Sequence, residues 1–151
     1  MKFSACWIVK NEAENIKKSI MSVKACCDEM IVVDTGSNDD TVKIAKECGA
    51  RVEHFKWISD FSAAKNYALS LAKGDYVIFL DGDEYFDPPL TKKSGREFYK
   101  TFKESRADTL RIPRYEMEKE DGSIKGIQAF DRILRRKTVH FENKVHEIPR
   151  R

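Results

Sequence analysis

The stretch Gly74–Glu84 has the sequence GDYVIFLDGDE. Its five consecutive apolar residues, Tyr76–Leu80, form a run that is too short for a typical helix. Short apolar runs between polar residues are typical of buried strands in parallel sheets. Three acidic residues follow the run almost directly. We therefore predict a buried strand over Asp75–Leu80 whose carboxyl end carries a cluster of carboxylates.

The residues before this stretch alternate between strand and helix patterns. Apolar runs predict three further strands, at Phe3–Val9, Met30–Asp34 and Arg51–Phe55. Helical periodicity separates these strands, and the predicted helix starts are Asn11 (with Glu14 as capping-box partner), the polar turn 35–40, and Ser59 or Asp60. Such alternation is typical of an α/β fold, so we predict an open, mostly parallel sheet with helices on both faces.

The residues after Pro88-Pro89 have a different character. A capping-box pattern at Ser94 and Glu97 predicts a short basic helix, and residues 109–130 predict a hairpin that turns at Asp121-Gly122. We expect one domain over residues 1–151, with 88–151 as its hairpin-bearing part. No closing element follows the last motif, so we expect this domain to be short at its C-terminus.

The composition is that of a folded, water-soluble chain. Of 151 residues, 41% are hydrophobic and 35% are charged, which excludes a disordered chain, and no apolar run could span a bilayer. Four cysteines without C-x-x-C spacing, and an N-terminus unlike a signal peptide, predict reduced thiols and a cytoplasmic location.

The charges are distributed unevenly. Residues 1–87 hold 11 Lys and Arg against 15 Asp and Glu, whereas residues 88–151 hold 17 against 10. An acidic half suits a cation, and a basic half suits phosphate or an anionic surface. The net charge of +3 is too small to predict a nucleic-acid partner.

Polar clusters follow three of the predicted strands, at Lys10-Asn11-Glu12, Asp34–Ser37 and Asp81–Glu84. In an open α/β sheet, ligands bind beyond the carboxyl ends of the strands, so we expect these clusters to converge. For Asp34 two interpretations stay open: a contact to the edge or ribose of a nucleoside, or an Asx-turn or helix cap.

The acidic loop predicts a metal site. Asp81 and Asp83 lie two residues apart around Gly82, and carboxylate oxygens suit Mg²⁺ or Mn²⁺, which take their other ligands from phosphate and water. The alternative is an ordinary Asp-Gly turn. His146 and Glu147 could bind a metal or accept a proton, or they could be a surface pair. P-loop, dinucleotide-binding and serine-hydrolase motifs are absent from the sequence.

Four motifs follow one another in the chain: CWIVKNEAENI, EMIVVDTGSNDDT, DFSAAKNYAL and GDYVIFLDGDE. Their order and spacing resemble the family 2 glycosyltransferases of the GT-A fold, over residues 3–87 and again at RILRR and VHE. The resemblance is closest to bacterial lipopolysaccharide-core and envelope sugar transferases. It implies a Rossmann-like GT-A sheet with residues 1–87 as the donor-binding half, a nucleotide-sugar donor (usually a UDP-sugar), a divalent cation (Mn²⁺ or Mg²⁺), and inverting transfer to a hydroxyl of a saccharide or lipid-linked acceptor.

The resemblance also implies roles for individual residues. Contacts to the nucleotide-sugar are expected at Ile8, Lys10, Glu12, Asp34, Asp60, Lys65, Asp81 and Gly82. Metal ligands are expected at Asp81, Asp83 and His146. The chain departs from the family at the general base, because the usual Glu-Asp pair is missing; Glu147 is the first candidate and Asp131 the second. Arg132 or Arg135 could assist at the diphosphate.

Two other functions stay open. A nucleotidyltransferase would need a glycine-rich basic loop after the first strand, which KNEAENI lacks. A non-catalytic nucleotide-sugar-binding module would bind the donor without transfer. The Q-x-x-R-W signature of processive synthases is absent. The basic residues 88–151 suggest peripheral contact with the inner face of a membrane, and the oligomeric state is not predicted.

Overall fold

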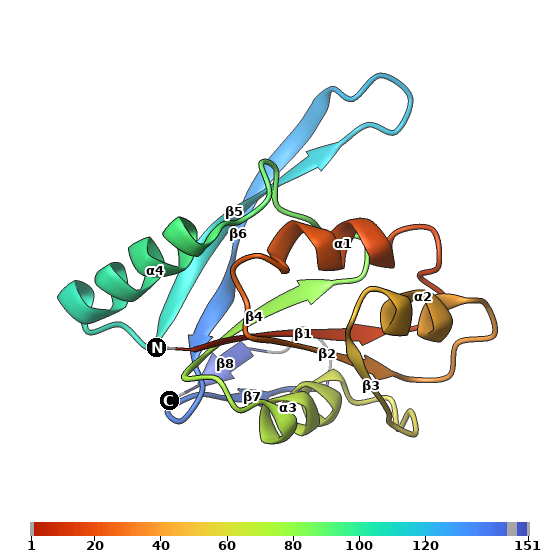
Figure 1. Cartoon of the computed structure of the whole chain (residues 1–151), viewed down its shortest axis with the longest axis horizontal. Helices are drawn as coiled ribbons and strands as arrows, with labels where there is room; N and C mark the ends of the chain where they lie inside the picture. The colour runs from red at the N-terminus through yellow and green to blue at the C-terminus, as the bar shows by residue number, and fades with distance from the viewer. Residues whose placement is uncertain (1, 145–147, 151) are drawn as a thin grey trace.

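The computed structural model describes residues 2–144 and 148–150, and its centre is a six-stranded sheet. The strand order is β3-β2-β1-β4-β6-β5, with β1 to β4 parallel and β6 antiparallel to both of its neighbours (Figure 1). The strand bounds are β1 Phe3–Val9, β2 Glu29–Asp34, β3 Arg51–His54, β4 Tyr76–Asp81, β5 Thr109–Met117 and β6 Ile124–Arg135. The predicted open, mostly parallel sheet is confirmed.

Helices cover both faces of this sheet, as the alternation of patterns predicted. Their bounds are α1 Ile16–Val23, α2 Thr41–Glu47, α3 Phe61–Leu71 and α4 Lys92–Ser105. Buried residues of α1, α2 and α4 share one core cluster with Trp7. Residues of α3 share the other cluster with Cys6, because neighbouring residues of a strand point to opposite faces. A small antiparallel pair, β7 (His140–Glu142) and β8 (Ile148–Arg150), is associated with α3 through Phe141 in this second core.

Two buried polar contacts hold the sheet to its surroundings. Trp7 is fully buried, and its Nε1–H donates to Ser19 Oγ at 2.7 Å. At the amino-terminal edge, Ser4 Oγ donates to Glu29 Oε1 at 2.5 Å and accepts from the Gly74 N–H at 2.9 Å. Burial raises the pKa of Glu29, but the hydrogen bonds it accepts outweigh burial and leave the pKa below its usual value. Both contacts join segments that are distant in the sequence.

The helix starts agree with the sequence at α3 but not at α1. Asp60 caps α3, since its Oδ1 accepts from the Ala63 N–H at 3.0 Å. The prediction of a helix start at Asn11 was wrong: α1 begins at Ile16, and Asn11 has a φ of 54°. Its side-chain oxygen instead accepts from the Asn38 N–H at 2.7 Å. Asn11 therefore serves a loop from another part of the chain.

The capping box of α4 begins three residues earlier than predicted. Thr91 is the N-cap, and the side chains of Thr91 and Ser94 form the reciprocal bonds of the box. Ser94 is thus the third helical residue of α4 and not its cap.

The hairpin of β5 and β6 turns around Asp121-Gly122, as predicted, and extends beyond the ends of the other strands (Figure 1). Gly122 has a φ of 72°, in the left-handed region that glycine adopts without strain. Nearer the sheet, Leu110 pairs with Ile133 and Arg111 pairs with Asp131. Arg132 is therefore the extra residue of a β-bulge, a device that redirects a side chain.

Among residues 2–144 and 148–150, none of the helices has the length and apolar character that crossing a lipid bilayer requires.

Candidate functional site

The register of the sheet brings the three polar clusters to one edge. Ile8 of β1 lies opposite Asp81 of β4 on one side and opposite Val33 of β2 on the other, while Val9 lies opposite Asp34. Ile8 is half-buried, and Lys10 is exposed just beyond the end of β1. The carboxyl ends of β1, β2 and β4 therefore form one surface, as the sequence predicted.

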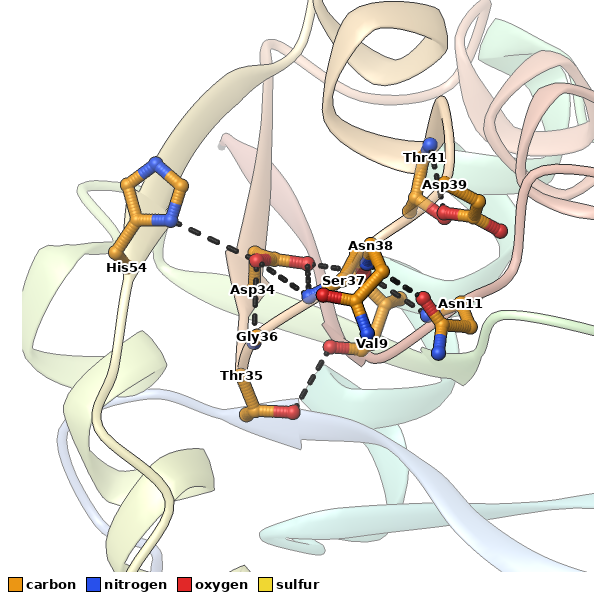
Figure 2. A network of polar contacts seen from close by, with 10 residues as sticks. All are labelled: Val9, Asn11, Asp34, Thr35, Gly36, Ser37, Asn38, Asp39, Thr41 and His54. Atoms are coloured by element: carbon orange, nitrogen blue, oxygen red, sulfur yellow. Dashed lines mark hydrogen bonds and ion pairs between the residues drawn. The ribbon is translucent and has the colours of Figure 1, made fainter.

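Asp34 is buried at the end of β2, and its carboxylate holds the loop that follows (Figure 2). It accepts hydrogen bonds from the Gly36 N–H at 3.1 Å, from the Ser37 N–H at 3.1 Å and from Ser37 Oγ at 2.5 Å. His54 Nδ1 lies 3.6 Å from Asp34 Oδ2. Of the two interpretations open for Asp34, the Asx-turn is present in the structure, and the nucleoside contact stays a prediction.

The loop after β2 is tied to the loop after β1 (Figure 2). The Asn11 N–H donates to Ser37 Oγ at 2.9 Å, and the Glu12 N–H donates to Thr41 Oγ1 at 2.8 Å. Thr41 Oγ1 also donates to Asp39, and this bond lowers the pKa of the Asp39 carboxyl below its usual value. The two loops are thus fixed relative to each other before any ligand arrives.

Glu12 and Gly82 bring the loop after β1 and the loop after β4 into close contact. A Cβ atom placed on Gly82 would lie 2.6 Å from Glu12 Cγ, so only glycine fits at this position while Glu12 keeps its place. Glu12 Oε2 accepts from Asn15 Nδ2 at 3.1 Å, which orients the Glu12 side chain. The absence of a side chain at position 82 is therefore a requirement of the local packing.

The acidic loop after β4 is held by arginines of the hairpin. The Asp81 N–H donates to Glu84 Oε1 at 2.7 Å, and Arg132 Nη2 lies 3.0 Å from Glu84 Oε2 and 3.5 Å from Asp81 Oδ2. Arg114 Nη1 reaches Glu84 Oε2 at 3.6 Å. The side chain of Glu84 is only 12% exposed, whereas that of Asp81 is 54% exposed. Glu84 therefore belongs to the support of the loop, and Asp81 faces the solvent.

The donor set of this loop fits a hard divalent cation. Asp81 and Asp83 are both exposed and offer carboxylate oxygens. Within the described part of the chain there is no group of three His, Cys, Asp or Glu side chains arranged to hold a metal. Two carboxylates nevertheless suffice for Mg²⁺ or Mn²⁺, which complete their coordination with phosphate oxygens and water. The predicted metal ligand His146 lies outside the described residues.

The α3 residues of the predicted site have structural contacts. Asp60 is the helix cap described above, and Lys65 is buried with its ammonium group 4.9 Å from the ring centre of Phe141 and 5.6 Å from that of Phe79. Asn66 exchanges two hydrogen bonds with the backbone of Phe141. The contacts of Asp60 and Lys65 to a donor stay predictions.

Neither candidate for the general base is settled by the structure. Glu147 lies outside the described residues. Asp131 Oδ1 accepts from Thr109 Oγ1 at 2.9 Å and lies 3.9 Å from Arg111 Nε. Asp131 is therefore engaged by contacts within the hairpin, and its role as a base stays a prediction.

Two features of this edge were not predicted. Glu84 was assigned to the acidic cluster without a role of its own, although it is the residue that both arginines contact. His54 was not among the predicted site residues, and it lies beside Asp34. Of the two arginines suggested for the diphosphate, Arg132 lies at the acidic loop, whereas Arg135 contacts Asp108. The pairing register of β6 decides which of these two arginines reaches the acidic loop. This register could not be predicted from the sequence.

Comparison with known proteins gives consistent results. Residues 4–141 match the family described as glycosyl transferase family 2. An uncharacterised glycosyltransferase of Rickettsia felis is 44% identical over 89 residues, covering 59% of this chain and 31% of that protein. A TPR repeat-containing protein of Synechococcus elongatus is 51% identical over 81 residues, covering 54% of this chain and 20% of that protein.

Two solved structures have a fold similar to that of this chain. S. aureus TarS (residues 1–349) superposes with a TM-score of 0.61 at 27% identity, over 82% of this chain and 37% of that chain. Glucosyl-3-phosphoglycerate synthase of Mycobacterium tuberculosis, in complex with Mn²⁺ and UDP-glucose, superposes with a TM-score of 0.50 at 30% identity, over 56% and 34%. The matched regions thus span between 20% and 37% of the length of these relatives and solved chains. On the match over residues 4–141, the chain belongs to glycosyl transferase family 2.

Proposed function

We propose that this chain is an inverting glycosyltransferase domain that uses a UDP-sugar and a divalent cation. The observation that carries the proposal is the convergence of Asp34, Glu12 and the Asp81–Asp83 pair at one edge of the sheet. Similar solved chains were crystallised with UDP, with UDP-glucose and with Mn²⁺ or Mg²⁺, which supports this choice of donor and cation. Membership of the family favours glycosyl transfer over nucleotidyl transfer.

The proposed roles follow from position and chemistry. The edge formed by Ile8, Lys10 and Asp34 would hold the nucleoside, and Asp60 and Lys65 would border it from α3. Asp81 and Asp83, with His146, would hold the cation, and Gly82 would let the diphosphate approach the backbone. The cation, when bound, stabilises the negative charge that builds on the diphosphate as the glycosidic bond breaks. Arg132 lies close enough to the loop to add positive charge there.

Transfer also needs a group that takes the proton from the attacking hydroxyl on the opposite face of the sugar. Glu147 is our first choice and Asp131 our second. The acceptor would be a saccharide or a lipid-linked saccharide of the cell envelope, reached from the cytoplasmic side with peripheral contact to the inner membrane. The basic balance of residues 88–151 supports contact with an anionic surface.

A donor-binding module without transfer activity is the second candidate. It is favoured by the position of Asp131, which is engaged by Thr109 and Arg111 within the hairpin. Release of UDP from a UDP-sugar in the presence of an acceptor separates the two functions, because a binding module would retain the donor intact.

The test of donor binding is calorimetric titration of UDP into the protein with and without Mn²⁺. We expect binding that depends on Mn²⁺ and is lost when Asp81 and Asp83 are both replaced by alanine. Asp121→Ala is the matched control, because Asp121 is an exposed acidic residue in the hairpin turn. Absence of UDP binding in the wild-type protein, or equal binding in the double variant, would overturn the proposal.

A further inference from the structure

Arg132 occupies an unusual position for an arginine of a hairpin. It is the extra residue of the β-bulge in β6, and its guanidinium is directed at the acidic loop rather than along the hairpin. Its side chain is 11% exposed and stacks near the Phe130 ring, with 4.9 Å from the guanidinium carbon to the ring centre. The bulge and the ring therefore hold a positive charge against Asp81 and Glu84.

The contacts of Arg132 are incomplete on one side. Its Nε–H is buried and finds no hydrogen-bond acceptor among the described residues. A buried donor without an acceptor destabilises the arrangement in which it is left. The guanidinium is thus held by its hydrogen bond to Glu84 and by charge attraction to Asp81, while its Nε–H is left without an acceptor in the described part of the chain.

A divalent cation and Arg132 would compete for the same carboxylate. Asp81 Oδ2 lies 3.5 Å from Arg132 Nη2, and Asp81 is one of the two carboxylates that fit Mg²⁺ or Mn²⁺. A cation bound to Asp81 would therefore have a guanidinium charge as an immediate neighbour. Because like charges repel, the position of Arg132 must affect how tightly the cation is held.

We propose that Arg132 is a positioning residue that holds the acidic loop in place of the cation and thereby limits the affinity of the loop for it. A cation held by Asp81 would displace the contact of Arg132 to Asp81, whereas the ion pair of Arg132 with Glu84 does not involve that carboxylate. The guanidinium is then left beside the loop, where an anionic ligand could engage it. This inference rests on the proposed cation-dependent function and names a determinant of its cation affinity.

Arg114 provides the comparison within the same cluster. It contacts Glu84 and Glu116, lies 4.3 Å from the Phe130 ring centre and also has a buried Nε–H that meets no acceptor within residues 2–144 and 148–150. Like Arg132, Arg114 carries a positive charge, lies near the Phe130 ring and contacts the carboxylate of Glu84. Its ion pairs, however, are with Glu84 and Glu116 rather than with Asp81. The proposal therefore assigns the effect on the cation to Arg132 and not to Arg114.

The test measures Mn²⁺ affinity without nucleotide, by the electron paramagnetic resonance signal of free Mn²⁺, in the whole chain. A unit charge about 5 Å from a divalent ion in nearly aqueous surroundings changes the affinity of that ion about tenfold. We expect Arg132→Gln to tighten Mn²⁺ binding about tenfold, Arg132→Lys to stay near the wild type, and Arg114→Gln to change binding by less than about threefold. Thermal unfolding of each variant checks that it is folded.

The outcomes separate the inference from the function on which it rests. If Arg132 only braced the loop, Arg132→Gln would weaken Mn²⁺ binding, so an unchanged or weaker affinity overturns the inference even when the wild type binds Mn²⁺. If neither the wild type nor Arg132→Gln binds Mn²⁺ without nucleotide, the inference fails, whereas the proposed function fails only if the wild type also shows no Mn²⁺-dependent binding of UDP. If Asp83→Asn loses the Mn²⁺ binding that the wild type shows, the measured site is the acidic loop.

Discussion

Replacement of Gly82 by alanine would place a methyl group 2.6 Å from Glu12 Cγ and 3.0 Å from Glu12 Cβ. Normal carbon contacts lie at about 3.5–4.0 Å, so the two loops must separate by about 1 Å or Glu12 must rotate away. Rotation would break the bond to Asn15, whose loss at an exposed site costs about 1 kcal/mol. We therefore expect the free energy of unfolding of Gly82→Ala to fall by about 1–2 kcal/mol.

The effect on ligand binding should be larger than the effect on stability. Asp81 and Asp83 flank position 82, and a displacement of about 1 Å in a binding group can reduce its effectiveness by about tenfold or more. Calorimetric titration of UDP with Mn²⁺ measures this loss, and urea denaturation measures the stability. Gly126→Ala is the matched control, because a Cβ there meets nothing closer than 4.0 Å. Wild-type UDP affinity in Gly82→Ala would refute our account of this contact.

Three further changes test the fold around the site. Gly74→Ala places a Cβ 2.8 Å from the backbone nitrogen of Ser4, which cannot move aside, so urea denaturation should show a loss of about 3 kcal/mol, and a loss under 1 kcal/mol would contradict this. Trp7→Phe leaves the buried hydroxyl of Ser19 without its donor, and the same assay should show about 2 kcal/mol lost, whereas an unchanged midpoint would contradict it. The pKa of Glu29 is lowered in the folded protein, so its stabilisation is present above its unfolded value of 4.5 and is lost as the pH falls through the lower folded value. The wild type should therefore lose more stability than Glu29→Gln between about pH 5 and about pH 3, and parallel pH profiles of the two proteins would count against the hydrogen bonds to Glu29.

The strands were predictable because their signals are local. Apolar runs at Phe3–Val9 and Tyr76–Leu80 are each bounded by polar residues, and the strands found there differ from the prediction by at most one residue at either end. Asp60 was predictable as a possible helix start for the same reason, since a cap bonds to a residue three positions away.

Contacts between distant segments were not predictable in this way. The pattern at Asn11 and Glu14 satisfies the local rule for a capping box, but Asn11 bonds to Asn38, in the loop after another strand. The side chain of an asparagine can accept a hydrogen bond from any backbone N–H that the fold brings near. At Asn11 the bond from Asn38 therefore replaced the local capping bond that the sequence pattern predicts. The contact of Arg132 to Glu84 depends on the β-bulge, and a bulge leaves no mark in residue composition.

The place of β1 in the sheet has a consequence for how the chain must assemble. β1 pairs with β2 at a separation of about 25 residues, but its other edge pairs Phe3 with Tyr76. During synthesis, the first three strands and their helices can associate while this apolar edge of β1 still lacks its neighbour. Such open parallel edges pair slowly and invite contact between chains. The interval before residue 81 emerges is therefore one in which a nascent chain of this protein is exposed to aggregation.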